Sequence, residues 1–312
     1  MSADEKKRSI FAIAGPTCSG KTTLGVRLAK HVGGEVVNFD SVQLYKGIEI
    51  ATAKPSVVEK QGVPHHLIDY VDPNVDYTAA DWAADAAQVI ADIEARGKIP
   101  ILVGGTGFYF RTLRRPLFEG PKTDAELRAR LRAIHSRSGA ERLHRMLARV
   151  DPELAERVPQ KDHVRVIRGL EVYFQTGVRL SAKQPDRMEP PEFAERIKLF
   201  VLNPPRDVLY EKINRRTASH FEQGLVEEVK QLLASGVNEK GNALGAHGYR
   251  RVCEYLRGER TLLSAIEQSK QDVRNYAKRQ FTWFRRESDA VWLDGFGDEA
   301  KVWQRLLHLI SS

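Results

Sequence analysis

The stretch GPTCSGKT, residues 15–22, constrains the fold most strongly, because it matches the phosphate-loop pattern G-x-x-x-x-G-K-[ST]. The apolar run SIFAIAG precedes it, and TTLGVRLAKHVGG follows with apolar residues at helical spacing. The loop is therefore expected between a buried strand and a helix, where backbone N–H groups and the helix N-terminus attract phosphate. The predicted phosphate-binding residues are Gly15, Pro16, Thr17, Cys18, Ser19, Gly20, Lys21 and Thr22.

Two side chains of this loop have distinct expected roles. Lys21 supplies a mobile positive charge, and the hydroxyl of Thr22 can ligate Mg²⁺. Cys18 stands where a small side chain is needed, which favours a filler over a redox sensor. The pattern predicts a bound diphosphate or triphosphate, and leaves open whether that compound is an energy source or the substrate.

The remaining apolar runs indicate the fold class. EVVNFD (35–40) and IPILVGG (99–105) are typical of buried strands, and an alanine-rich helical stretch precedes the second. Alternating strands and helices favour a parallel sheet with helices on both faces. We therefore predict an α/β fold, with a P-loop NTPase-like core whose parallel sheet is flanked by helices, plus a helical insertion domain.

The insertion is expected to begin near residue 116, where the pattern changes to helix with little strand. Prolines at positions 185, 190 and 191 mark its end, and RIKLFVL (196–202) restores strand character. The predicted core is thus discontinuous, with residues 1–115 and 197–312, and the insertion covers residues 116–196.

Charge and termini narrow the class of protein. The net charge is +8 and the pI about 9.4, which suits a polyanionic partner. Residues 111–180 hold 16 Lys and Arg against 9 Asp and Glu, although solvated helix faces would also explain this excess. The opening MSADEKKRS lacks the apolar core of a signal peptide, and no apolar stretch approaches the ~20 residues that cross a bilayer. We expect a cytoplasmic protein without a membrane partner, whose two cysteines are reduced.

Asp40 is the main candidate for further chemistry. It ends the strand VVNFD, where a kinase or NTPase would place an acid for its metal ion. The next residues, SVQLY, add a hydroxyl and a carboxamide, which suits reading a base edge or moving a proton. An aspartate that caps a turn is the third alternative.

Several motifs together resemble one family. GPTCSGKT, DSVQLYKGIEIATAKP, HHLIDYVDP, PILVGGTGFYFRTL, VRVIRGLEVYFQTG, HGYRR and YAKRQFTWFRR occur in the order seen in tRNA dimethylallyltransferases, from about Phe11 to Asp294. The phosphate loop is shared with many unrelated enzymes, whereas the DSVQLY and TAKP pair and the AKRQFTWFR ending are far more particular. YTAADWAADA and ALGAHGYRR depart from the usual pattern outside the expected chemistry.

The resemblance implies transfer of a dimethylallyl group from dimethylallyl diphosphate to N6 of the adenine on the 3′ side of a tRNA anticodon. The loop would then hold the diphosphate of the donor, which departs as pyrophosphate stabilised by Lys21, Arg216 and Mg²⁺. Asp40 would accept the proton of the adenine amine. The implied catalytic residues are thus Asp40, Lys21 and Arg216.

The same resemblance implies how tRNA is held. The flipped adenine would enter beside Asp40, Ser41, Val42, Gln43 and Thr106. Other RNA contacts would come from Val164, Arg165, Val166, Ile167, Arg168, Ala246, His247, Gly248, Tyr249, Arg250 and Arg251. The arginine-rich insertion would grip the anticodon stem through phosphates and shape.

Two further features stay open on the sequence alone. VRNYAKRQFTWFRR interleaves cations with Tyr276, Phe281, Trp283 and Phe284, which fits either nucleic-acid binding or a core helix with exposed arginines. His65 and His66 are neighbours that would face opposite sides of a strand, so we expect no metal site there.

Two alternatives to the transferase differ in class. A small-molecule P-loop kinase would use ATP without RNA, and a non-enzymatic RNA-binding protein would use a nucleotide as a switch. No obligate protein partner is evident; a monomer is compatible with the sequence, which leaves the oligomeric state open.

Overall fold

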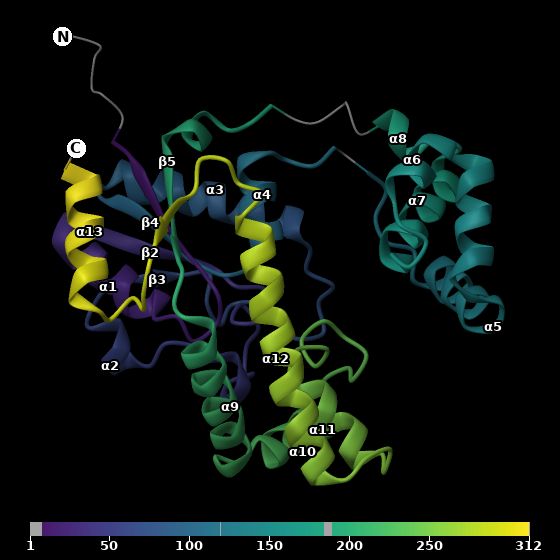
Figure 1. Cartoon of the computed structure of the whole chain (residues 1–312). Helices are drawn as coiled ribbons and strands as arrows, with labels where there is room; N and C mark the ends of the chain where they lie inside the picture. The colour runs from purple at the N-terminus through teal and green to yellow at the C-terminus, as the bar shows by residue number, and fades with distance from the viewer. Residues whose placement is uncertain (1–7, 119, 184–188, 312) are drawn as a thin grey trace. The chain divides into compact units, whose positions relative to one another are not determined.

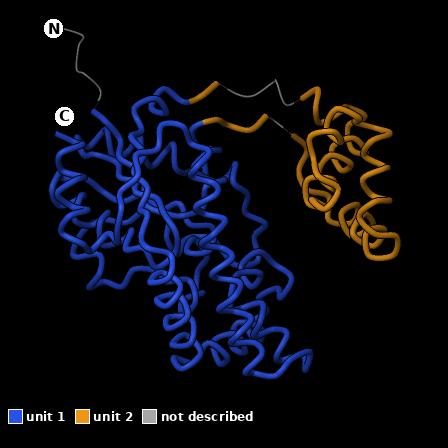
Figure 2. The backbone as a smooth tube through the Cα atoms, viewed as in Figure 1, with its two compact units in different colours: residues 1–114, 191–312 blue, residues 115–190 orange. Residues whose placement is uncertain are grey.

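The computed structural model describes residues 8–118, 120–183 and 189–311. The chain divides into two compact units, unit 1 with residues 1–114 and 191–312, and unit 2 with residues 115–190 (Figure 2). The second border lies six residues before the expected one. The reason is that η2 (Glu192–Arg196) forms a 3₁₀ turn that leads directly into the next strand of unit 1.

Unit 1 is built on a six-stranded sheet in the order β3-β2-β4-β1-β5-β6, in which every neighbouring pair is parallel. Its strands are β1 (Ile10–Ala14), β2 (Gly34–Phe39), β3 (His65–His66), β4 (Ile99–Gly104), β5 (Ile197–Leu202) and β6 (Val291–Leu293). Ala12 of β1 pairs with Leu102 of β4 and Leu199 of β5. All five residues of β1 are buried, as expected for a parallel sheet covered on both faces, so the predicted α/β core is confirmed.

Helices cover both faces of this sheet (Figure 1). The helices of unit 1 are α1 (Lys21–Val32), α2 (Val57–Lys60), α3 (Ala79–Ala95), α4 (Gly107–Arg114), α9 (Arg206–Glu222), α10 (Leu225–Ala234), α11 (Tyr249–Leu256), α12 (Leu262–Phe284) and α13 (Ala300–Ser311), with the 3₁₀ turn η1 (Ile50–Thr52). Leu24 of α1 and Leu306 of α13 belong to the core on one face, and Trp82 of α3 and Phe110 of α4 to the core on the other. None of the helices in the described ranges is long and apolar enough to span a membrane.

The close packing of α1 against the sheet depends on a glycine. A Cβ atom on Gly25 would lie 2.5 Å from Cγ2 of Val103 in β4, so a larger residue would push the helix outward. Because α1 begins at the phosphate loop, this contact also fixes the height of that loop over the carboxyl ends of the strands.

All the regular elements in the described residues of unit 2 are helices. Its helices are α5 (Ala125–Val150), α6 (Pro152–Arg157), α7 (His163–Thr176) and α8 (Leu180–Lys183). Leu143, Leu147 and Leu170 are fully buried in its own hydrophobic core. The buried carboxylate of Glu171 pairs with Arg128 at 2.9 Å and with Arg168 at 2.8 Å, which ties α7 to α5.

Candidate active site

The phosphate loop joins β1 to α1 and turns sharply along its length. Gly15, Cys18 and Gly20 have φ angles of 147°, 63° and 86°, in the region that favours glycine. The side chain of Lys21 folds back over the loop, and its Nζ donates a hydrogen bond of 2.7 Å to the carbonyl of Pro16. The backbone therefore forms a tight cradle with the lysine above it.

Arg216 reaches this loop from α9. Its Nη2 donates a hydrogen bond to the hydroxyl of Thr17. Burial lowers the pKa of Lys21 to about 8; the charge of Asp40 opposes this shift and that of Arg216 adds to it. Three segments that are distant in the sequence therefore bring Lys21, Asp40 and Arg216 within electrostatic reach of one another.

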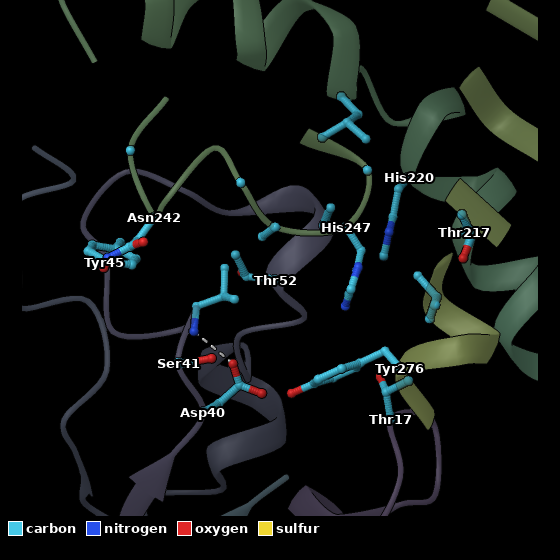
Figure 3. Close-up of a pocket in the computed structure, with 18 of the residues that line it drawn as sticks. Thr17, Asp40, Ser41, Tyr45, Thr52, Thr217, His220, Asn242, His247 and Tyr276 are labelled. Carbon is cyan, nitrogen blue, oxygen red and sulfur yellow. Dashed lines mark hydrogen bonds between the residues drawn. The ribbon is translucent and has the colours of Figure 1, made fainter. Parts of the chain in front are cut away.

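Asp40 follows β2, and its carboxylate is oriented by the main chain. Its Oδ1 accepts hydrogen bonds from the N–H groups of Val42 at 2.9 Å and Gln43 at 3.3 Å. The other carboxylate oxygen points into the cavity toward Tyr276 (Figure 3). Asp40 thus caps a turn, as one of the alternatives for this residue expected, and also presents an oxygen to the cavity.

A cavity of about 530 Å³ joins the two predicted halves of the site (Figure 3). Of the residues predicted for the site, it is lined by Thr17, Asp40, Ser41, Val42, Arg216, Ala246, His247 and Gly248. In Figure 3 the ring of Tyr276 lies between Asp40 and Thr17, and Arg216, which bonds to Thr17, lines the same cavity. A ligand in this space can therefore touch both a phosphate-binding loop and a carboxylate.

Comparisons with known proteins identify the family of the chain. The family model described as IPP transferase matches residues 43–287. The chain belongs to the IPP transferase family. It is 46% identical over 291 residues to the tRNA dimethylallyltransferase of Geobacter metallireducens, covering 93% of this chain and 94% of that protein. It is 44% identical over 311 residues to tRNA dimethylallyltransferase 1 of Citrifermentans bemidjiense, covering 100% of both.

Solved structures of IPP transferases agree with this assignment. The full-length tRNA isopentenylpyrophosphate transferase of Bacillus halodurans superposes with a TM-score of 0.70 at 36% identity, covering 98% of this chain and 95% of that one. A eukaryotic dimethylallyltransferase acting on tRNA superposes with a TM-score of 0.76 at 28% identity, covering 96% and 78%. The family resemblance predicted from the motifs is confirmed.

The predicted adenine-binding residues of this IPP transferase divide into two groups. The hydroxyl of Thr106 accepts a hydrogen bond of 3.0 Å from the N–H of Ser41, so it holds the segment that follows Asp40. Gln43, in contrast, directs its carboxamide N–H groups to the carbonyls of Thr52 at 3.1 Å and Ala53 at 2.9 Å. Gln43 therefore braces the loop around η1 and does not line the cavity.

The segment 246–251 is only partly available to RNA. Tyr249 is fully buried, and its hydroxyl donates to Glu228 at 3.1 Å, which corrects the expectation that this side chain contacts RNA. Arg250 and Arg251 line a second cavity of about 230 Å³, which shares Ala246 and His247 with the first.

The segment 164–168 of α7 also needs a correction. Val166 and Ile167 are 0% and 5% exposed and belong to the core of unit 2, so their side chains cannot contact RNA. Val164 is 68% exposed, and the side chain of Arg165 is 59% exposed. Arg168 is committed to Glu171 and donates to the carbonyl of Pro121 at 3.0 Å.

The aromatic residues of α12 lie in different surroundings. Phe281 and Phe284 are buried in the core. Tyr276 lines the main cavity and packs against the ring of His247 with centroids 4.7 Å apart. The guanidinium of Arg111 lies 4.5 Å from the ring centre of Trp283. The helix α12 therefore supplies side chains both to the core and to the main cavity.

The two histidines that form β3 both contact other residues of the protein. Nε2 of His66 lies 2.7 Å from the carboxylate of Glu35, and Nδ1 of His65 lies 2.8 Å from the carbonyl of Val63. Among the described residues, no group of three or more His, Cys, Asp or Glu side chains is placed to hold a metal ion.

Sequence reasoning missed several residues of the site, among them His220 and Gln280. Burial lowers the pKa of His220 to about 4, with help from the charge of Arg216, so this lining residue presents a neutral imidazole. Gln280 bonds to the phosphate loop through the N–H of Thr17 at 2.8 Å. Gln280 belongs to the motif AKRQFTWFR, but the spacing of residues in that motif did not indicate which way its side chain points.

Proposed function

We propose that this IPP transferase moves a dimethylallyl group from dimethylallyl diphosphate to N6 of the adenine on the 3′ side of the anticodon in tRNA. The observation that carries the proposal is that Thr17, Arg216 and Asp40 line one and the same cavity. The relatives act on tRNA by their names, and they give no support to the kinase alternative.

The diphosphate of the donor would lie in the loop of residues 15–22, close to Lys21 and Arg216. Charge accumulates on the departing pyrophosphate as the allylic C–O bond breaks, and preorganised cations and N–H groups stabilise that charge. Lys21 folded over the loop and Arg216 bonded to Thr17 support this assignment.

The residues of the loop fit a magnesium ion held jointly with the donor. Ser19 is 0% exposed, and its hydroxyl has no hydrogen-bond partner within the described part of the chain. This buried hydroxyl in the loop is therefore free to bond to a ligand. Mg²⁺ usually keeps several waters and binds few protein oxygens besides phosphates, which suits Thr22 as its protein ligand. When bound, the ion would neutralise charge on the diphosphate.

Asp40 would act as the general base. The N6 nitrogen forms a bond to the allylic carbon while the C–O bond to diphosphate breaks and its electron pair leaves with the oxygen. The extra proton on nitrogen then passes to the carboxylate oxygen of Asp40 that faces the cavity (Figure 3). Hydrogen bonds from Val42 and Gln43 hold the carboxylate in this orientation.

RNA would be held by cations around the cavity and on unit 2. Arg250, Arg251 and Arg279 line the second cavity, and the exposed Arg165 lies in the first turn of α7. Such side chains suit contacts with RNA phosphates, which need charge rather than base recognition.

The decisive experiment incubates the protein with an unmodified anticodon stem-loop RNA, dimethylallyl diphosphate and Mg²⁺. Mass spectrometry of nuclease digests should find one added C₅H₈ group on adenine, and pyrophosphate should appear in equal amount. If the mass of the RNA does not change in this incubation, and a second incubation without RNA consumes ATP, the proposal is refuted and the kinase alternative is favoured.

A further inference from the structure

The side chain of Gln280 links α12 to two loops of the active site. Its carbonyl oxygen accepts a hydrogen bond of 2.8 Å from the N–H of Thr17 in the phosphate loop. Its amide nitrogen donates one of 3.0 Å to the carbonyl of Gly105, directly after β4. One carboxamide thus joins a helix to the segments that follow β1 and β4, which are neighbours in the sheet.

The surroundings of Gln280 leave it little freedom. The residue is 3% exposed. A Cβ atom on Gly105 would lie 2.0 Å from Nε2 of Gln280, so the glycine makes room for the carboxamide. A buried amide with both ends bonded is held in one orientation, because losing either bond would leave a polar group unpaired.

Thr17 connects Gln280 to Arg216 through two hydrogen bonds. The N–H of Thr17 is taken by Gln280, while the hydroxyl of Thr17 accepts a hydrogen bond from Arg216. Gln280 therefore fixes the orientation of the residue against which the diphosphate-binding arginine rests.

The same helix also borders the acceptor side of the cavity. Tyr276 precedes Gln280 by four residues, so the two side chains lie on one face of α12. Tyr276 stands between Asp40 and Thr17 in the cavity (Figure 3). Arg279 lines both cavities. RNA that contacts Arg279 or packs on Tyr276 would therefore be in direct contact with α12.

We propose that Gln280 is a positioning residue that couples the two substrates. It holds Thr17, and through Thr17 the guanidinium of Arg216, at a fixed place relative to the helix that the adenine and its RNA contact. RNA bound against α12 then favours the arrangement that binds diphosphate, and by linkage the donor favours RNA binding equally. The inference rests on the proposed function.

The test measures this coupling without turnover. Dimethylallyl S-thiolodiphosphate, a slowly reacting donor analogue, is titrated into the full-length protein with and without an unmodified anticodon stem-loop RNA. The ratio of the two dissociation constants should be about 5–150 for the wild type, the usual range of coupling between sites. In Gln280→Met, which keeps the volume and removes both hydrogen bonds, the ratio should fall close to one.

A matched control lies on the same helix. Gln271 is exposed, and its carboxamide bonds only to Asn275 and Arg274 among the contacts of the described residues. Gln271→Met should keep the wild-type ratio. Gly105→Ala offers a second route to the same break, because its methyl group would displace the Gln280 amide while the sequence of α12 is unchanged; the methyl group would also lie 3.2 Å from the carbonyl oxygen of Gly15. It should lower the ratio as Gln280→Met does.

The outcomes separate this inference from the proposed function. If the role of Gln280 is purely structural, its loss should weaken analogue binding by the same factor with and without RNA. An unchanged ratio of dissociation constants in both Gln280→Met and Gly105→Ala would therefore overturn the coupling. A wild-type ratio of one would overturn it as well. If the wild type transfers no prenyl group and binds neither the analogue nor the RNA, the proposed function fails, and the coupling fails with it.

Discussion

Arg216 of α9 donates a hydrogen bond to the hydroxyl of Thr17, so the helix after β5 is joined to the loop after β1. The two residues lie 199 positions apart in the chain, with the whole of unit 2 between them. The contact places a guanidinium beside the loop of residues 15–22, which is the preorganisation that the proposed departure of diphosphate would require.

Replacing Arg216 should therefore slow chemistry more than it weakens RNA binding. We expect Arg216→Ala to lower the single-turnover rate of prenyl transfer by about 10²–10³, as for other preorganised charge contacts. The neighbouring Arg215 is exposed and serves as the matched control, since Arg215→Ala removes the same charge from the same helix. Equal rates for the two variants would mean that Arg216 does not contact the leaving group.

Asp40→Asn tests the general base. The amide can still accept hydrogen bonds from Val42 and Gln43, so the turn should survive while the proton acceptor is lost. The single-turnover rate should drop by about 10²–10⁴, with donor affinity little changed. Titration calorimetry of the donor with and without Mg²⁺ provides the check, because a large loss of Mg²⁺-dependent binding would assign Asp40 to the metal instead.

Lys21 should make donor binding depend on pH. Its pKa is lowered to about 8 by burial, so in the free protein the lysine is charged below pH 8 and loses its charge above it. Affinity for dimethylallyl diphosphate should be flat up to about pH 8 and then fall by as much as about tenfold per pH unit, with proton uptake on binding. Calorimetry across this range measures both effects. Lys21→Met should bind weakly with a flat profile; the same slope in that variant would assign the titration to another group.

The arginines of α7 should separate into two roles. Arg165→Ala should reduce the slope of log affinity for tRNA against log salt by roughly 0.7–0.9, the value for one lost phosphate contact. Arg168→Ala should instead lower the free energy of unfolding by about 1–3 kcal/mol, because it removes a bond to the buried Glu171. Salt titrations of tRNA affinity and urea unfolding of both variants test these two roles. If Arg168→Ala keeps the wild-type stability but reduces the salt slope, Arg168 contacts phosphate and its structural role is wrong.

Glu35 should govern stability in acid. A hydrogen bond from Arg96 holds the pKa of Glu35 at about 2, against burial and with help from His66. The ionised form therefore stabilises the fold above pH 4.5, and this contribution is lost as the pH falls from 4.5 toward 2. Urea unfolding of Glu35→Gln should show a smaller loss of stability than the wild type between about pH 5 and pH 3. Parallel curves for the two proteins would contradict this role.

The sequence alone determined the parts of this protein that depend on local chain geometry. The phosphate loop between β1 and α1 follows from glycines, a lysine and a threonine within eight residues, and these act through backbone conformations available only to such patterns. The parallel sheet follows from buried apolar runs that alternate with helical stretches. The order of the longer motifs was enough to predict the family.

Only the tertiary structure decided which side chains face the site. Tyr249 and Gln43 stand in motifs of the family, yet one is buried against Glu228 and the other braces η1. Gln280 became a link to Thr17 because packing turned that face of α12 toward the loops after β1 and β4. Helical periodicity shows which residues share a face, whereas the contact of that face depends on segments hundreds of positions apart, and their meeting is set by burial of the whole core.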